Sequence, residues 1–283
     1  MIKVTNQIGK ELRLSRFLNP DSKRTVMVAY AHGILMGPMK GMETNEEIKR
    51  QNETLKAADA VLMPMGFLPS CQKLFTGKNA PEMIALYDWQ SISRSKSQLG
   101  YTEGAIEPVT TIDRVLASGA IGVMTYLFIG FDDPLREANE MRRNYEVNEL
   151  CQKYGLIHII EPRVVKSKET NEDGTMKLDL MKVHTRMAAE LGADFIKVKY
   201  PDTPERLKEL QDISPAPLLV AAVLRLRTTL RIRWQKPPLL QTQAVLYLEE
   251  MYTSPTIRKQ RWNVSAELSI RNKNNHRQRE EIV

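Results

Sequence analysis

Short apolar runs alternate along the chain with longer stretches in which apolar residues recur at helical spacing. Continuous hydrophobicity over a few residues is typical of strands that are buried on both faces of a parallel sheet. Seven such runs lie at residues 25–31, 60–65, 83–87, 121–129, 156–160, 195–200 and 217–222. Strands that alternate with helices in this way predict an α/β fold with parallel strands and helical crossovers.

The clearest helix is expected at residues 134–154. Either Asp132 or Asp133 can cap its first turn, a proline occupies its first position, and a glycine follows its last residue. A second helix is expected at residues 178–191. The polar stretch at residues 166–177 between the two is expected to be a loop, either a mobile cover or an ordinary solvated connection.

This pattern of elements predicts a (β/α)8 barrel that is complete through strand six or seven. A doubly wound open sheet is the structural alternative. We expect the barrel to be incomplete after strand seven, because the character of the sequence changes there.

Composition and charge locate this change. The chain has 283 residues, of which 42% are hydrophobic, and its net charge is +7. These values exclude a disordered or collagen-like chain. Residues 222–283 contain twelve Lys or Arg and five Asp or Glu, so the whole excess of positive charge lies in this tail, and all fourteen glycines precede it. We therefore predict an α/β barrel at residues 1–221 and a poorly packed, basic tail at 222–283.

The sixth strand carries the most informative polar residues. Alternation along a strand places Lys197 and Lys199 on one face, where a barrel strand usually presents apolar side chains. Burial of an ammonium is costly, and a second one nearby disfavours protonation of both, so the pair is suited to supply a neutral amine. A neutral amine is what Schiff-base formation with a ketone requires. The alternative is that both side chains extend out of the strand end to solvent.

Four other residues are weaker candidates. Tyr126 is a candidate general acid or a core tyrosine, and Glu161 could pair with a lysine of the sixth strand, move a proton, or form a surface pair with Arg163. His32 follows the first strand, and Asp88 closes the third, where it could line a pocket or simply end the strand.

Other classes of site and partner are not expected. Cys71 and Cys151 have no partner at metal-ligand spacing, so we expect two buried thiols, no metal and no cofactor. His158 and His184 likewise have no ligand-spaced partners. The chain shows neither an apolar leader nor a run long enough to cross a bilayer, so we expect a cytoplasmic protein without a membrane partner.

Three segments resemble the Schiff-base, class I aldolases of the archaeal fructose-bisphosphate type, within the deoxyribose-phosphate and tagatose-bisphosphate aldolase superfamily. They are residues 13–37, 58–66 and 187–200, and the resemblance spans about residues 11–222. It implies a (β/α)8 barrel, carbon–carbon bond cleavage or formation in phosphorylated ketoses, and Lys197 as the Schiff-base lysine. It also implies a role in carbohydrate metabolism such as glycolysis, and assembly into a homo-oligomer. Relatives include a synthase and a thiolase.

Three features depart from this family. Ala31 replaces a family aspartate, and Phe128 occupies the place of a tyrosine that serves as the acid in some members. The family binds phosphate at glycine turns after strands seven and eight, whereas this chain has no glycine after residue 221. Displacing the reading frame lets residues 222–223 and 248–252 encode both turns. We therefore hypothesise that the tail is read in a shifted frame.

The sequence thus predicts a class I aldolase in which Lys197, Tyr126 and Glu161 are catalytic and His32, Asp88 and Lys199 bind substrate. A catalytically impaired homologue, or a related synthase or thiolase, is the alternative. The third possibility is nucleic-acid binding by the basic tail. We do not expect it, because a shifted frame accounts for the basicity.

Overall fold

Eight parallel strands form a closed barrel in the order β1–β10–β9–β8–β7–β6–β3–β2. The computed structural model describes residues 5–38, 42–94, 99–101, 103–222 and 242–246. The barrel strands are β1 (Met27–Ala29), β2 (Ala60–Pro64), β3 (Glu82–Leu86), β6 (Gly122–Ile129), β7 (Ile157–Val164), β8 (Phe195–Lys199), β9 (Leu218–Ala222) and β10 (Thr242–Leu246). The first seven of these coincide with the seven apolar runs, so the predicted barrel class is confirmed and the open sheet is wrong.

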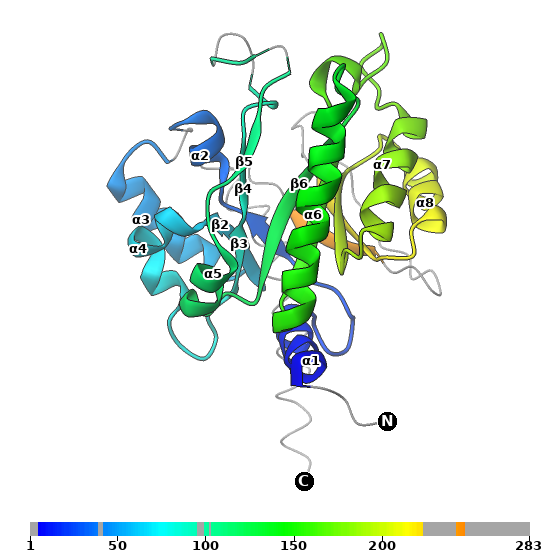
Figure 1. Ribbon diagram of the computed structural model, residues 1–283. Helices are drawn as coiled ribbons and strands as arrows, with labels where there is room; N and C mark the ends of the chain where they lie inside the picture. Colours follow the sequence, from blue (N-terminus) through cyan, green and yellow to red (C-terminus); the bar gives the residue numbers. More distant parts are fainter. Residues whose placement is uncertain (1–4, 39–41, 95–98, 102, 223–241, 247–283) are drawn as a thin grey trace.

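Helices surround the strands on the outside of the barrel (Figure 1). They are α2 (His32–Met36), α3 (Asn45–Leu55), α4 (Leu68–Cys71), α5 (Ile112–Ser118), α6 (Pro134–Tyr154), α7 (Leu178–Glu190) and α8 (Pro204–Ile213), with short 3-10 turns at Met65–Phe67, Gln72–Phe75 and Lys166–Lys168. A further helix, α1 (Thr5–Phe17), lies at one end. The bounds of α6 and α7 confirm both predicted helices. Asp133 is the cap of α6 and accepts from Leu135 N–H, whereas Asp132 forms an ion pair with Lys168.

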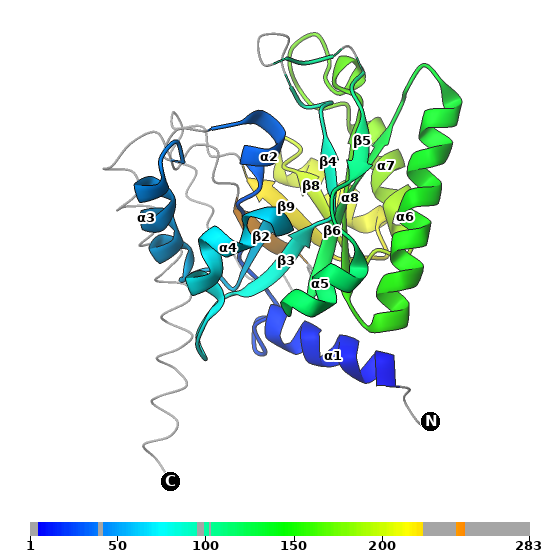
Figure 2. The same ribbon diagram turned by 60° about the vertical axis from the view of Figure 1, so that its left-hand side comes forward.

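The first helix lies across the end of the barrel at which the strands begin (Figure 2). Phe17 packs edge-on against Phe195 with ring centroids 5.2 Å apart, and Lys10 forms an ion pair with Asp194 at 2.8 Å. Gly155 has a φ of 67°, and a Cβ at this position would lie 2.4 Å from the Asn6 carbonyl oxygen. The helix is therefore tied to the start of β8 and to the turn before β7, and it covers the amino ends of these strands.

β10 corrects the expectation of a barrel that stays incomplete after strand seven. Thr242–Leu246 aligns in parallel register with Leu218–Ala222 of β9, and part of it also pairs with Met27 and Val28 of β1. A parallel ladder is formed by backbone groups, so its formation does not require particular side chains. The predicted boundary at residue 222 stays a prediction, and the remaining tail, with its expected poor packing, lies outside the described residues.

A short antiparallel ribbon, which the sequence analysis did not predict, rises from the end of the barrel at which the strands finish. It consists of β4 (Asp88–Gln90) and β5 (Ile106–Pro108). The pairing between β3 and β6 ends at Met124, whereas β6 pairs with β7 through Ile129, so the edge of β6 that faces β3 needs other hydrogen-bond partners beyond Met124. Side chains that include Asp88 and Glu140 supply them.

Two clusters of buried apolar residues stabilise the barrel. One includes the interior of the barrel and the contact of β7, β8 and β9 with α7 and α8, and the other lies between β1, β2, β3 and the helices outside them. Cys71 and Cys151 are buried, free thiols, which confirms the prediction for both. Among the helices that the structure describes, none is long and apolar enough to cross a membrane.

Candidate active site

A buried ion pair lies inside the barrel where β7 and β8 meet. The Nζ atom of Lys197 is 2.7 Å from Oε2 of Glu161, and the two side chains are 1% and 3% exposed. The register that aligns Ile160 with Ile196 places the next residue of each strand side by side and on the same face. Of the two expectations for Lys197, burial is confirmed and extension to solvent is wrong.

Glu161 lies within a strand rather than at its end. β7 continues through Pro162 to Val164, four residues further than the apolar run indicates. The predicted surface pair with Arg163 is also wrong, because Glu161 is buried, although Arg163 Nη1 lies 3.5 Å from Glu161 Oε1. Glu161 therefore contacts two cations in a region sheltered from water.

His32 begins α2 and is buried beside this ion pair. Burial lowers the pKa of His32 to about 4. The positive charge of Lys197 adds to this decrease, and the negative charge of Glu161 opposes it. The imidazole is therefore neutral at neutral pH and can donate one hydrogen bond and accept another. Ala31 occupies the cap position of α2 and makes no side-chain cap bond.

Tyr126 lies on β6 at the same level as Glu161. The two residues are register partners in the parallel pair β6–β7, so their side chains share a face of the sheet. The Tyr126 ring is buried and packs against Phe128, with ring centroids 6.0 Å apart. Tyr126, Glu161 and Lys197 thus come from three adjacent strands, as expected for side chains that face one site.

Charged side chains continue from the ion pair toward the ends of the strands. Arg163 Nε lies 2.8 Å from Glu169 Oε1, and Lys199 Nζ lies 2.9 Å from Glu169 Oε2. Burial lowers the pKa of Lys199, and the charge of Arg163 lowers it further. Burial favours a higher pKa for Glu169, but its two cationic partners outweigh this and hold that pKa below its usual value. The result is a row of alternating charges: Lys197, Glu161, Arg163, Glu169 and Lys199.

Glu169 belongs to the polar segment expected to be either a mobile cover or a solvated loop. Its backbone carbonyl accepts from Lys177 N–H, and Thr170 and Met176 form an isolated antiparallel bridge. The segment is thus folded back on itself beside the site. Neither Arg163 nor Glu169 was predicted from the sequence to be functional, although Arg163 is two residues from Glu161 and so shares its face of the strand.

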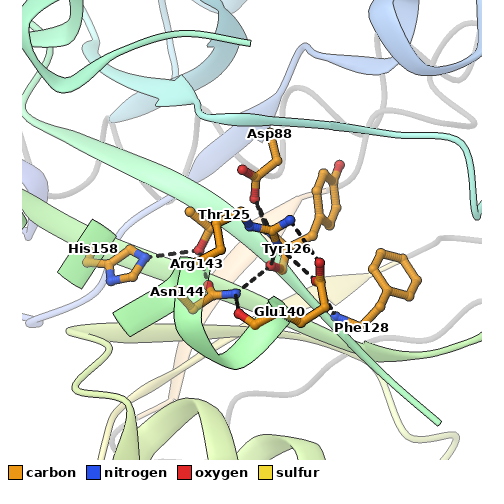
Figure 3. A network of polar contacts seen from close by, with 8 residues as sticks. All are labelled: Asp88, Thr125, Tyr126, Phe128, Glu140, Arg143, Asn144 and His158. Carbon is orange, nitrogen blue, oxygen red and sulfur yellow. Dashed lines mark hydrogen bonds and ion pairs between the residues drawn. The ribbon is translucent and has the colours of Figure 1, made fainter. Parts of the chain in front are cut away.

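The structure places Asp88 in a different environment, against the backbone of β6 (Figure 3). Its Oδ2 accepts from Tyr126 N–H at 2.9 Å and lies 3.5 Å from Arg143 Nη2. Complete burial raises the pKa of Asp88 to about 6, and the charge of Arg143 opposes this increase. A structural role therefore explains Asp88 better than the predicted contact with substrate.

Residues of α6 complete this network. Arg143 and Asn144 donate to the Tyr126 carbonyl at 2.6 and 2.9 Å, and Glu140 accepts from Phe128 N–H (Figure 3). Glu140 also forms an ion pair with Arg143 at 2.8 Å. The network satisfies the edge of β6 that β3 leaves unpaired, and it holds the strand that carries Tyr126.

A separate cavity of about 500 Å³ lies between the ends of β1 and β2 and the helices outside them. Its lining includes Tyr30, Pro64, Phe67 and Arg114, and among the described residues it includes none of the row of charges. Elsewhere in the described part of the chain, no three His, Cys, Asp or Glu side chains are grouped so as to hold a metal ion. The candidate active site is therefore the cluster around Lys197 and Glu161.

Comparison with known proteins gives consistent matches. A family model described as DeoC/LacD family aldolase matches residues 25–224. An uncharacterized aldolase of Saccharolobus solfataricus is 29% identical over 222 residues, covering 78% of this chain and 79% of that protein. A 3-hydroxy-5-phosphonooxypentane-2,4-dione thiolase of Photorhabdus laumondii is 25% identical over 214 residues, covering 75% of this chain and 66% of the thiolase, just under two thirds of its length.

A solved structure has a similar fold. It is a Schiff base-forming fructose-1,6-bisphosphate aldolase, with a TM-score of 0.70 and 18% sequence identity, and the match covers 92% of this chain and 99% of the other.

Proposed function

The chain belongs to the DeoC/LacD family of aldolases, and on this basis we propose that it is a class I aldolase. Lys197 would form a Schiff base with the carbonyl carbon of a phosphorylated ketose such as fructose 1,6-bisphosphate. The observation that carries the proposal is the buried contact of 2.7 Å between Lys197 and Glu161. It places an amine, and a carboxylate that can take its proton, in one water-poor site.

The first step of the proposed reaction is the transfer of a proton from the Lys197 ammonium to Glu161. The neutral amine then attacks the substrate carbonyl carbon, and one proton passes from the attacking nitrogen to the carbonyl oxygen to give a neutral carbinolamine. Protonation of this hydroxyl by the Glu161 carboxylic acid releases water and leaves an iminium ion. Glu161 ends this step as a carboxylate, so it is a proton shuttle with no net change.

The iminium ion then accepts the electron pair of the carbon–carbon bond that breaks. The hydroxyl group next to this bond loses its proton and becomes the aldehyde product, while the remaining fragment becomes an enamine on Lys197. We assign proton transfer at this stage to Tyr126 or Glu161, whose strands align them at one level. His32, neutral and next to Lys197, is assigned to hydrogen bonds with substrate hydroxyl groups. Protonation of the enamine and hydrolysis then free Lys197.

The comparisons support this assignment in two ways. The similar fold of a Schiff base-forming fructose-1,6-bisphosphate aldolase makes the same chemistry a reasonable proposal for a barrel of this type. The family model covers all the strands that carry the candidate residues. By the same resemblance we propose a cytoplasmic homo-oligomer that acts in carbohydrate metabolism.

Borohydride trapping tests the proposal. The full chain is incubated with dihydroxyacetone phosphate or fructose 1,6-bisphosphate, reduced, digested and mapped by mass spectrometry. We expect one adduct, on the peptide that contains Lys197, and its loss in Lys197→Met. Lys199→Met is the matched control and should retain the adduct on Lys197, though at a higher substrate concentration. If wild-type protein carries no adduct at Lys197, the Schiff-base proposal fails.

Two observations favour alternatives. The thiolase of Photorhabdus laumondii is a relative, and a thiolase differs from an aldolase in requiring a thiol acceptor for the cleaved fragment. Cleavage that depends on an added thiol would therefore favour this reaction. Ala31 lacks the carboxylate expected of the family, which favours an impaired aldolase. Such a protein would still form the adduct on Lys197 but turn over slowly.

We also propose that the sequence after residue 221 is read in a shifted frame. The aldolase-type sequence would then end at residue 221, and the tail at 222–283, which supplies β10, would follow it. The absence of glycine after residue 221 supports this proposal. The nucleotide sequence around codons 220–224 tests it, because codons that cannot encode the two glycine turns when displaced would contradict it.

A further inference from the structure

We infer that Arg163 and Lys199 form a subsite for the phosphate of the substrate, and that the Glu169 carboxylate occupies this subsite until substrate binds. One carboxylate oxygen lies 2.8 Å from Arg163 Nε and the other lies 2.9 Å from Lys199 Nζ. A phosphate group can make the same two contacts, because it also carries oxygens on one central atom and two of them can face the two cations. The inference rests on the proposed function, because it concerns the substrate of the same site.

The row of charges contains two carboxylates in different settings. Glu161 lies within β7, so the pairing of this strand fixes its position. Glu169 follows the short 3-10 turn Lys166–Lys168 on the connection between β7 and α7. Its side chain can turn away from the two cations without disturbing a strand. Glu169 is therefore the carboxylate of the row that a substrate can displace.

The cations that Glu169 contacts cannot leave as easily. Arg163 and Lys199 lie on β7 and β8, and their side chains are 16% and 34% exposed. When Glu169 departs, Arg163 keeps its contact with Glu161 but loses one carboxylate, and Lys199 loses the Glu169 carboxylate. Loss of a counter-ion from a partly buried cation is costly, so binding of another anion is favoured. A phosphate monoester carries close to two negative charges at neutral pH, against one on the carboxylate, and so competes well for both cations.

The subsite is also at a suitable distance from the reactive amine. Lys197 and Lys199 are two residues apart on β8 and share a face, so their Cα atoms are separated by about 7 Å. A few carbon atoms between a carbonyl group and a phosphate span this distance. The subsite lies toward the carboxyl ends of the strands, where substrates enter barrels of this type. Sugars without phosphate cannot offset the contacts of Glu169, so the subsite selects phosphorylated substrates.

This location differs from the phosphate site that the family resemblance implies. That site uses glycine turns after strands seven and eight, and this chain has no glycine after residue 221. In this chain, side chains of β7 and β8 would bind the phosphate, whereas backbone amides bind it in the family that the chain resembles.

Binding of glycerol 3-phosphate to the full chain tests the inference. This probe has a phosphate monoester but no carbonyl group, so its affinity does not depend on the Schiff base. Isothermal titration at constant ionic strength compares wild type with Glu169→Gln and Lys199→Gln. Glu172→Gln is the matched control, since Glu172 is an exposed residue of the same segment. Glycerol is the control ligand without phosphate.

We expect Glu169→Gln to bind glycerol 3-phosphate on the order of tenfold more tightly than wild type, and Lys199→Gln on the order of tenfold more weakly. Glu172→Gln should match wild type, and glycerol should show no difference among the variants. Should Glu169→Gln fail to fold by circular dichroism, Glu169→Asp, which withdraws the carboxylate by one methylene, should bind more tightly instead.

Two results would overturn the inference: equal affinities for wild type, Glu169→Gln and Glu172→Gln, or unchanged affinity in Lys199→Gln. Either one would place the phosphate elsewhere. Borohydride trapping of Lys197 with dihydroxyacetone phosphate reports separately on the proposed function. Failed trapping with the expected phosphate affinities contradicts only the aldolase, whereas successful trapping with unchanged affinities contradicts only the subsite.

Discussion

The ammonium of Lys197 and the carboxylate of Glu161 lie 2.7 Å apart and are almost completely buried. If Glu161 is the proton shuttle, Glu161→Gln keeps the shape of the side chain but removes its ability to accept a proton. We expect kcat for ketose cleavage to fall by about 10²–10⁴-fold, with a smaller effect on KM. Steady-state kinetics check this, with Glu172→Gln as the control. An unchanged kcat in Glu161→Gln would refute the shuttle.

The same pair has a stability consequence. Lys197→Met leaves Glu161 as a buried carboxylate that has lost one of its cations, and we expect a loss of about 3 kcal/mol in the free energy of unfolding. The double variant Lys197→Met/Glu161→Gln should recover part of this loss, because it removes the remaining buried charge. Urea unfolding of both single variants and the double variant measures the coupling. Additive losses would mean that the two charges do not stabilise each other.

Arg143 holds the network around β6 together. Arg143→Met removes the cation between Asp88 and Glu140, and we expect a loss of about 3–5 kcal/mol in the free energy of unfolding at pH 8. The loss should be smaller near pH 5, where both carboxyl groups can take up protons, since burial raises their pKa values to about 6 and 7. Arg142→Met, next along the helix and exposed, should change the free energy by less than about 0.5 kcal/mol. Similar losses in both variants would contradict this role.

Gly122 is the first residue of β6 and is aligned with Ile157 of β7. A Cβ at this position would lie 2.4 Å from the Ile157 carbonyl oxygen, which is backbone and cannot move aside. We therefore expect Gly122→Ala to lower the free energy of unfolding by about 3 kcal/mol. Gly66→Ala is the control, because no atom lies within 4 Å of its Cβ, and it should change the value by at most about 1 kcal/mol. Urea unfolding that ranks the two equally would contradict the close contact.

Stability should rise with pH around pH 5. Burial lowers the pKa of His32 to about 4 and of His158 and His184 to about 3, so the unfolded chain binds three more protons than the native state there. Asp88 and Glu140 oppose this, because the native state retains their two protons. The balance of one proton from these five groups corresponds to about 1.4 kcal/mol per pH unit.

Urea unfolding at a series of pH values checks this slope. Glu140→Gln removes one opposing group and should make the slope steeper by about 1.4 kcal/mol per pH unit. Glu172→Gln should leave the slope at the wild-type value. A stability that falls as pH rises through 5 would show that the histidines are not held neutral.

The sequence predicted those features of the fold that depend on local pattern. Seven of the eight barrel strands and the long helix α6 follow from runs and spacing, because a parallel barrel buries whole strands and covers them with amphipathic helices. β4 and β5 escaped prediction, since each has three residues and both include polar ones. The ribbon is stabilised by pairing between residues that are sixteen or more positions apart in the sequence, and not by the strand propensity of its residues.

The site could be predicted only in part. Spacing placed Lys197 on an unusual face but could not show its burial, because burial depends on whether a partner such as Glu161 faces it. Asp88 was assigned to substrate binding, since a polar residue at a strand end has the same pattern whether it faces the barrel or a neighbouring backbone. The role of Glu169 could not be predicted from the sequence, because the partners of a loop residue depend on the path that the loop takes in the fold.

One sector of the barrel wall is joined differently from the rest. Beyond Met124, where the pairing of β3 with β6 ends, the side chains of Asp88, Glu140, Arg143 and Asn144 bond to the backbone of β6 in place of a ladder. A ladder holds adjacent strands about 4.8 Å apart whatever their sequence, but a spacing set by side chains changes when those side chains change. Substitutions on α6 can therefore change the distance between the ends of β3 and β6, and with it the width of the barrel at this end. The other strand pairs keep their register.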